Sequence, residues 1–291
     1  MTGERAGAAD PAGADGGTTA ATTTATATAA ASCVAGVPEL EVIEYTDPAC
    51  PWAWGSEPKF RQLRARLGGI GTVGGTGAGA RWRRVFGILF DEGEEPAPDP
   101  AAEAAWYLTE LEEISSHTGA PYPMRLGWVA RSSWPASLAA KAAERQGSAI
   151  ADAVLDRLRE TTFLDGEPAD SPERVIAALR GRVPGLDLDA LAAQAAGPDV
   201  LAAVRADWAQ TRRPCAEVLN LTEPGRHPGR AKPLGEDPED GFRYALPTLV
   251  LLGPRGRAVV PGWRGLEEYL AAARQVTAAI PGLDQGSDLS R

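Results

Sequence analysis

The sequence predicts an α/β protein in which a small sheet is interrupted by an all-helical insertion of about six helices. Strand-like patterns stand at 40–47 and again at 246–252. Between them, from about 101 to 213, Ala, Leu, Arg and Glu dominate at helical spacing. A Pro- and Glu-rich stretch at 91–100 separates the two regions. The predicted order is therefore strand, helix, strand, the helices of the insertion, two strands and a final helix.

Composition divides the 291-residue chain into three parts. Residues 1–38 are Ala, Thr and Gly with scattered acids, and we expect them to be disordered, because such a stretch cannot bury enough apolar surface to offset its ordering entropy. The segments 39–92 and 214–282 are expected to form one discontinuous sheet domain, and 93–213 the helical insertion. The tail lacks the basic start and apolar run of a secretory signal. No stretch approaches the roughly 20 consecutive apolar residues of a membrane span.

The first strand and helix follow from local patterns. At 40–47 the letters L-E-V-I-E-Y-T-D alternate apolar and polar residues until an Asp-Pro pair stops the strand. A helix is predicted from Pro51 to the glycines at 68 and 69, and Pro58 is expected to kink it. We interpret the Gly-rich segment 70–79 as a loop rather than a nucleotide site, because no strand precedes it and no helix follows it.

The remaining elements are predicted in the same way. A second strand runs from Arg81 to Leu89, and later strands at 246–252 and 258–260 precede a last helix at 266–280. The segment 214–243 is rich in Pro, Gly and charge, and its length indicates a functional or mobile loop. Ser132-Ser133 and Ser171 stand before prolines, as helix-capping residues do. The insertion helices are predicted at 101–117, 135–147, 149–163, 172–182, 187–196 and 198–212.

Composition also excludes several functions. A formal charge of −10 argues against nucleic acid as a partner, since phosphate neutralisation needs clustered cations. His117 and His227 stand far apart without metal-ligand spacing, so no metal site is expected, and we assign them to a helix end and a loop. Three cysteines are too few for the disulfide framework of a secreted scaffold, and we expect a protein of the reducing cytoplasm that does not act at a membrane.

The stretch T-D-P-A-C-P-W-A-W-G at 46–55 is the candidate reaction centre. Cys50 lies where the strand gives way to the helix, so its sulfur should face unpaired amides and the positive end of the helix dipole, which favour a thiolate of lowered pKa. Pro51 presets the first helical turn. Trp52 and Trp54 could form an apolar, partly exposed collar around the sulfur. The competing interpretation is a buried structural cysteine.

A second signal stands at the head of a later strand. In Leu246-Pro247-Thr248 the proline cannot donate to a sheet ladder, which makes its position unusual. A cis peptide before Pro247 would turn the backbone of Leu246 toward the cysteine.

These motifs resemble the DsbA-like branch of the thioredoxin superfamily, in its cytoplasmic FrnE-like subgroup of dithiol-disulfide isomerases. The matching segments are D-P-A-C-P-W-A-W-G at 47–55, S-S-W-P-A-S-L-A-A-K-A-A at 132–143 and A-L-P-T-L-V-L at 245–251. The resemblance implies a thioredoxin-like core with a helical insertion, with Cys50 as the attacking thiol. It implies an active-site frame of Asp47, Pro51, Trp52, Ala53 and Trp54, and a substrate groove at Leu246, Pro247 and Thr248.

Ala53 departs from the pattern of redox-active relatives, which carry a second cysteine at this position. Without it, a mixed disulfide on Cys50 has no neighbouring thiol to resolve it. A low-molecular-weight thiol, another protein, or a distant cysteine must then do so, and Cys215 and Cys33 are the intramolecular candidates. We expect no tightly bound cofactor. The predicted function is thus thiol-disulfide oxidoreduction or isomerisation through a single cysteine.

Two other classes remain open. Kappa-class glutathione transferases and hydroxychromene-carboxylate isomerases are similar in having this core with a helical insertion, but they place a serine where this chain has Cys50. A thioredoxin-like adaptor that binds a protein partner would not need redox chemistry, and Ala53 is compatible with that role.

Overall fold

The computed structural model describes residues 40–68, 80–91 and 97–277. The predicted disordered tail, the loop at 70–79 and residues 278–280 of the predicted last helix lie outside the described residues. A four-stranded sheet has the order β2-β1-β5-β6, with β1 parallel to β2 and antiparallel to β5, and β5 antiparallel to β6. These strands are β1 (Glu41–Thr46), β2 (Arg81–Phe86), β5 (Thr248–Gly253) and β6 (Gly256–Pro261). The predicted α/β class is confirmed.

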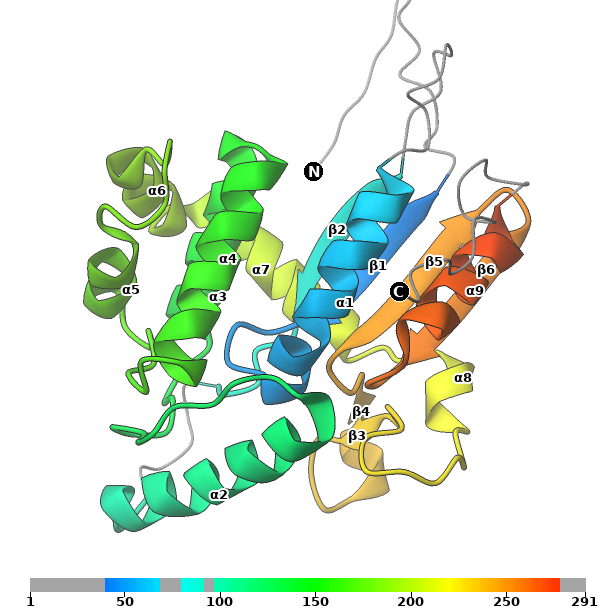
Figure 1. The fold of residues 1–291 in the computed structure, drawn as a ribbon, viewed down its shortest axis with the longest axis horizontal. Helices are drawn as coiled ribbons and strands as arrows, with labels where there is room; N and C mark the ends of the chain where they lie inside the picture. The colour runs from blue at the N-terminus through cyan, green and yellow to red at the C-terminus, as the bar shows by residue number, and fades with distance from the viewer. Residues whose placement is uncertain (1–39, 69–79, 92–96, 278–291) are drawn as a thin grey trace, which may run out of the picture. The chain divides into compact units, whose positions relative to one another are not determined.

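Helices α1 (Pro51–Leu67) and α9 (Leu266–Val276) cover one face of the sheet (Figure 1). Phe60 of α1 and Tyr269 of α9 are fully buried there and meet edge to face, with ring centroids 5.3 Å apart. Proline at the first helical position suits the start of α1, and the helix continues through Pro58. On the opposite face Tyr45 of β1 stacks on Tyr244 at 4.0 Å.

In the described residues, six α-helices lie between β2 and the segment 214–243 in sequence, close to the predicted positions. Asp99 caps the first helix by accepting from two backbone amides, and Ser171 caps the fourth. Ser133 was predicted to cap a helix, but its hydroxyl donates a hydrogen bond to the carboxylate of Asp47 instead. The helices are α2 (Pro100–Thr118), α3 (Trp134–Ala143), α4 (Ser148–Phe163), α5 (Pro172–Leu179), α6 (Leu188–Ala195) and α7 (Pro198–Thr211).

The segment 214–243 is more ordered than its composition indicates. It contains the short helix α8 (Ala216–Leu219) and a small hairpin of β3 (Lys232–Pro233) and β4 (Phe242–Arg243). Two-residue strands with proline and charge carry no periodic signal, so sequence patterns missed them.

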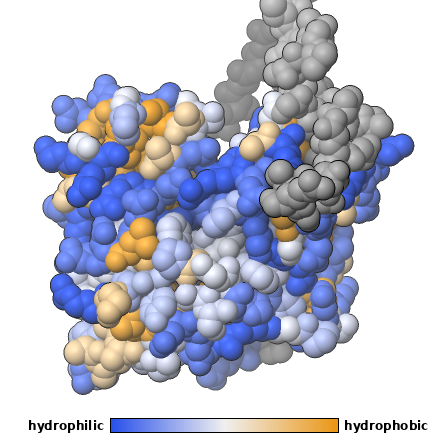
Figure 2. Space-filling view, viewed as in Figure 1, coloured by the Kyte–Doolittle hydropathy of each residue, from blue (hydrophilic) through white to orange (hydrophobic). Residues whose placement is uncertain are grey.

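In Figure 2 hydrophilic side chains cover most of the visible face, and hydrophobic ones gather in small groups over the helical insertion. Within the described ranges, no helix combines the length and apolar character needed to cross a bilayer.

Candidate active site

Cys50 is the N-cap residue of α1, at the end of the turn that follows β1. Its backbone is extended, with φ −86° and ψ 116°, and Pro51 begins the helix. The thiol donates to the carbonyl oxygen of Leu246, with Sγ and O 3.5 Å apart. The Leu246–Pro247 peptide is cis, as predicted. The fold therefore brings together two motifs that lie 196 residues apart in the chain.

The thiol is more enclosed than the sequence indicated. Cys50 is 3% exposed, and this burial raises its pKa to about 11. Hydrogen bonds from the backbone amides of Ala53 and Trp52 lower the pKa of Cys50, whereas the negative charge of Asp47 raises it further. The prediction of a lowered pKa was wrong, because the helix-terminus effect is smaller than the desolvation imposed by the surrounding chain. At neutral pH Cys50 is therefore a protonated thiol that donates a hydrogen bond to the carbonyl oxygen of Leu246.

Asp47 accepts hydrogen bonds from three segments that surround the cysteine. Its fully buried carboxylate accepts from the backbone of Ala49 at 2.8 Å, the backbone of Leu89 at 2.8 Å and the hydroxyl of Ser133 at 2.9 Å. Burial raises the pKa of Asp47. Ile88, just before Leu89, has φ 49°, an unusual value for a β-branched residue. Asp47 is therefore a structural anchor between the end of β1, the end of β2 and the start of α3.

Some residues of the predicted frame and of the predicted substrate groove line a cavity, and others do not. Pro51, Trp52 and Leu246 line a cavity next to Cys50. Trp54 instead faces away from it, donating to the carbonyl of Pro121 at 2.8 Å and stacking on Phe163 at 5.7 Å. The expectation that both tryptophans surround the sulfur therefore holds only for Trp52. Ala53 and Thr248 are fully buried, and the hydroxyl of Thr248 donates to Ala245.

His227, which we assigned to a loop without a role, is part of the site. Its Nε2 lies 2.8 Å from the Leu246 carbonyl oxygen, which also accepts the hydrogen bond from the Cys50 thiol. Because that oxygen can only accept, Nε2 must carry the proton. Burial lowers the pKa of His227 to about 4, so the ring is neutral at pH 7. The ring stacks on Trp52 at 4.5 Å, and His117 meets the same tryptophan at 5.6 Å. No sequence spacing could have revealed this grouping.

A cavity of about 460 Å³ lies next to Cys50. This volume is in the range of small-molecule sites. Helix α2 contributes to one wall, and the segment 226–232 with β4 contributes to another. The lining includes the buried Cys50 and the exposed Trp106. The lining residues are Cys50, Pro51, Trp52, Leu89, Phe90, Glu103, Trp106, Tyr107, Val129, Arg226, His227, Lys232, Arg243, Ala245 and Leu246.

Cys215, the candidate resolving thiol, stands at the start of α8, where its backbone amide donates to the hydroxyl of Tyr244 at 3.1 Å. Both Cys50 and Cys215 are free thiols. A resolving role for Cys215 therefore stays a prediction, and Cys33 lies outside the described residues. Among the residues that the structure describes, no cluster of three or more His, Cys, Asp or Glu could hold a metal ion.

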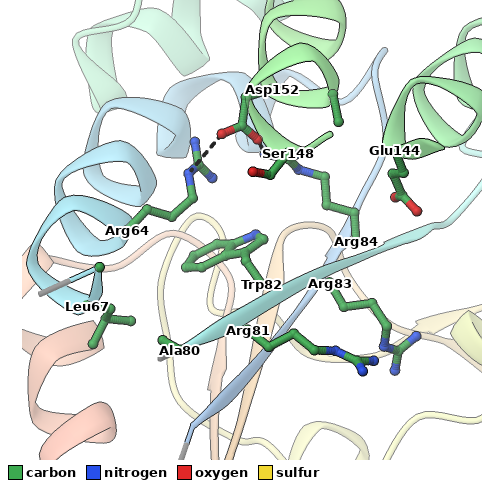
Figure 3. A pocket seen from close by; sticks show the side chains of 12 residues that line it. Arg64, Leu67, Ala80, Arg81, Trp82, Arg83, Arg84, Glu144, Ser148 and Asp152 are labelled. Carbon is green, nitrogen blue, oxygen red and sulfur yellow. Dashed lines mark hydrogen bonds and ion pairs between the residues drawn. The ribbon is translucent and has the colours of Figure 1, made fainter. Parts of the chain in front are cut away.

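A second cavity, of about 490 Å³, lies near the C-terminal end of α1 (Figure 3). Four arginines line it, but each has a carboxylate partner. Arg64 and Arg84 both reach Asp152, at 3.8 and 2.6 Å, as the dashed lines of Figure 3 mark. Arg81 and Arg83 reach Glu41 at 3.0 and 3.5 Å. Arg64 also contacts Glu57, and Arg84 also contacts Glu44, so carboxylates already surround these cations.

The sheet order, the cysteine at the start of α1 and the cis proline before β5 define a thioredoxin-like fold with a helical insertion. Solved structures of other proteins share this fold. A candidate protein disulfide isomerase from Nitrosomonas europaea has a TM-score of 0.55 and 14% identity, covering 82% of this chain and 95% of its own. A candidate DsbA oxidoreductase from Streptomyces coelicolor has a TM-score of 0.52 and 20% identity, covering 81% and 89%. No protein-family model and no curated protein matches the chain. At these identities the likeness is one of fold.

Proposed function

We propose that the protein is a thiol-disulfide oxidoreductase or isomerase of the DsbA type that acts through the single cysteine Cys50. The observation that carries the proposal is the contact between the Cys50 thiol and the Leu246 carbonyl beside cis Pro247, at the edge of a cavity of about 460 Å³. The fold shared with DsbA-like proteins supports the same class. We further propose membership of the FrnE-like subgroup and a cytoplasmic location.

The reaction is a pair of thiol-disulfide exchanges. Cys50 loses its proton to solvent, and its thiolate attacks one sulfur of a disulfide RSSR. A Cys50–S–S–R bond forms while the second sulfur leaves as RS⁻ and takes up a proton. A second thiolate, R′S⁻, then attacks the R sulfur, releasing RSSR′ and the Cys50 thiolate. With Ala53 in place of a second cysteine, R′S⁻ comes from a small thiol or from another protein. Cys215 would instead attack the Cys50 sulfur, releasing RS⁻ and forming a Cys50–Cys215 disulfide.

The raised pKa affects the two exchanges differently. Little thiolate is present at pH 7, so attack by Cys50 is slow, although each thiolate is more nucleophilic than one of lower pKa. A thiol of high pKa is also a poor leaving group, so the mixed disulfide on Cys50 should break slowly. The site is therefore better suited to holding a mixed disulfide than to rapid turnover.

Intact-mass analysis tests this function. In a Cys33→Ser/Cys215→Ser variant Cys50 is the remaining thiol of the chain. Incubation with 2-hydroxyethyl disulfide should add one adduct that dithiothreitol removes, and Cys50→Ser in the same background should add none. Restoring Cys215 should leave the adduct in place unless Cys215 resolves it into an intramolecular disulfide.

A native protein that gains no adduct, while the same protein gains one in urea, would contradict the proposal. The sulfur would then be inert in the fold. An adaptor that binds a protein partner without redox chemistry would be the better interpretation in that case.

A further inference from the structure

Two cations of the small hairpin face the cavity without a carboxylate partner. Lys232 of β3 and Arg243 of β4 are directly opposite in the register, and both line the cavity beside Cys50. Arg243 donates to the carbonyl of Tyr244 at 3.2 Å. No carboxylate in the described part of the chain forms an ion pair with either residue. Like charges directly opposite on a hairpin repel each other, so this pair is costly unless an anion neutralises it.

The other ionisable residues of the cavity do not cancel this pair. Arg226 is already paired with Glu113, and His227 is neutral at pH 7 because burial lowers its pKa to about 4. Glu103 of α2 is the one carboxylate among the described lining residues. The cavity therefore has excess positive charge in a protein whose formal charge is −10.

The rest of the lining strengthens the effect of these charges. Most of it is aromatic or aliphatic, including Trp52, Phe90, Trp106 and Val129. Charges next to apolar walls are screened less than charges in open water. The volume of about 460 Å³ suits a small molecule rather than a folded domain.

We propose that the cavity selects low-molecular-weight disulfides that carry carboxylates, with Lys232 and Arg243 as the residues that determine this specificity. The inference rests on the proposed exchange at Cys50 and names the class of its small-molecule partner. The carboxylate binds the hairpin cations while a sulfur of the ligand meets Cys50, and the exchange then follows the two steps given above.

Three disulfides of similar size but different charge test whether the cavity prefers disulfides that carry carboxylates. In the Cys33→Ser/Cys215→Ser background at pH 8 and low salt, the rate of adduct formation is measured with dianionic 3,3′-dithiodipropionate, neutral 2-hydroxyethyl disulfide and dicationic cystamine. Each rate is divided by the rate with a free cysteine peptide of neutral sequence. The dianion should react about tenfold or more faster than the dication, and salt should weaken the difference.

Removing the cations and removing the carboxylate of the cavity should change the ratio of the dianion rate to the dication rate in opposite directions. Lys232→Gln/Arg243→Gln should bring the ratio of the two rates to within about twofold of unity. Glu103→Gln should raise the ratio, because it removes the lining carboxylate. Arg230→Gln is the matched control, since Arg230 is an exposed cation of the same segment that does not line the cavity, and it should leave the ratio unchanged.

The outcomes separate this inference from the proposed function. Reaction with all three disulfides at equal relative rates, or a preference that survives Lys232→Gln/Arg243→Gln, overturns the selection while leaving exchange at Cys50 intact. Reaction with none of the three overturns both.

Discussion

Arg159→Met is expected to lower the free energy of unfolding by about 3–5 kcal/mol, because it removes one of the cations that buried carboxylates pair with. Arg159 of α4 is fully buried. Its Nη1 donates to Glu57 of α1 at 2.6 Å, and its Nη2 donates to the hydroxyl of Thr46 at 2.8 Å and lies 3.5 Å from Glu44. One side chain of the insertion thus joins the helix that carries Cys50 to the strand that precedes it.

The charges around Arg159 explain the size of this effect. Burial alone would raise the pKa of Glu44, but Arg84, Arg159 and Arg64 together hold it below its ordinary value. Glu44 is therefore ionised in the native state at neutral pH. Removing one buried partner of such a group costs more than the net stability of the pair, because the remaining charge stays out of water.

Urea unfolding of two variants from one helix measures the effect. Arg157→Met is the control, because Arg157 pairs with the partly exposed Glu160 and Asp165, and its loss should cost about 1 kcal/mol or less. Adding Glu57→Gln to Arg159→Met should recover part of the loss, since it removes one of the two buried carboxylates that Arg159 contacted. Equal costs for Arg159→Met and Arg157→Met would show that the buried network does not join the insertion to the core.

Ala53→Cys is expected to accelerate the catalysed reduction of a protein disulfide by about 100-fold or more. Ala53 lies in the first turn of α1, three residues after Cys50, and is fully buried. A thiol there would attack the mixed disulfide on Cys50 within the same molecule. Intramolecular attack has effective concentrations far above those of an external thiol, so even imperfect geometry gives a large gain.

Insulin reduction at limiting external thiol provides the measurement. Ala53→Ser introduces a side chain of similar size without sulfur, and it should leave the rate near that of the native protein. If Ala53→Cys were no faster than Ala53→Ser, release of the mixed disulfide would not be the slow step, and loss of the second cysteine would not explain slow turnover.

The sequence predicted most of the elements because their signals are local. The six helices of the insertion have apolar residues at helical spacing, and Ser171-Pro172 marks where one of them begins. The motifs around Cys50 and Pro247 located the two segments that meet at the site. The hairpin β3–β4 escaped detection because strands of two residues have no period.

The parts of the site that depend on tertiary contacts could not be predicted in this way. His227 reaches the Leu246 carbonyl only after the segment 214–243 folds back over Trp52. Arg159 meets Glu57 across 102 residues of sequence. The pKa of Cys50 was predicted in the wrong direction, because a helix-terminus argument includes the amides of α1 but not the desolvation by elements distant in the chain.

The pH dependence of mixed-disulfide formation tests most directly whether Cys50 reacts as a buried thiol that must first lose its proton. The rate with 2-hydroxyethyl disulfide is followed by intact mass from pH 7 to pH 10 in the Cys33→Ser/Cys215→Ser background, with circular dichroism to show that the protein stays folded. Because burial raises the pKa of Cys50 to about 11, the thiolate fraction should grow about tenfold with each pH unit, and the rate should rise with it without a plateau. A rate that levels off near or below pH 8.5 would show an exposed thiolate of ordinary or lowered pKa, and would contradict this structure of the site.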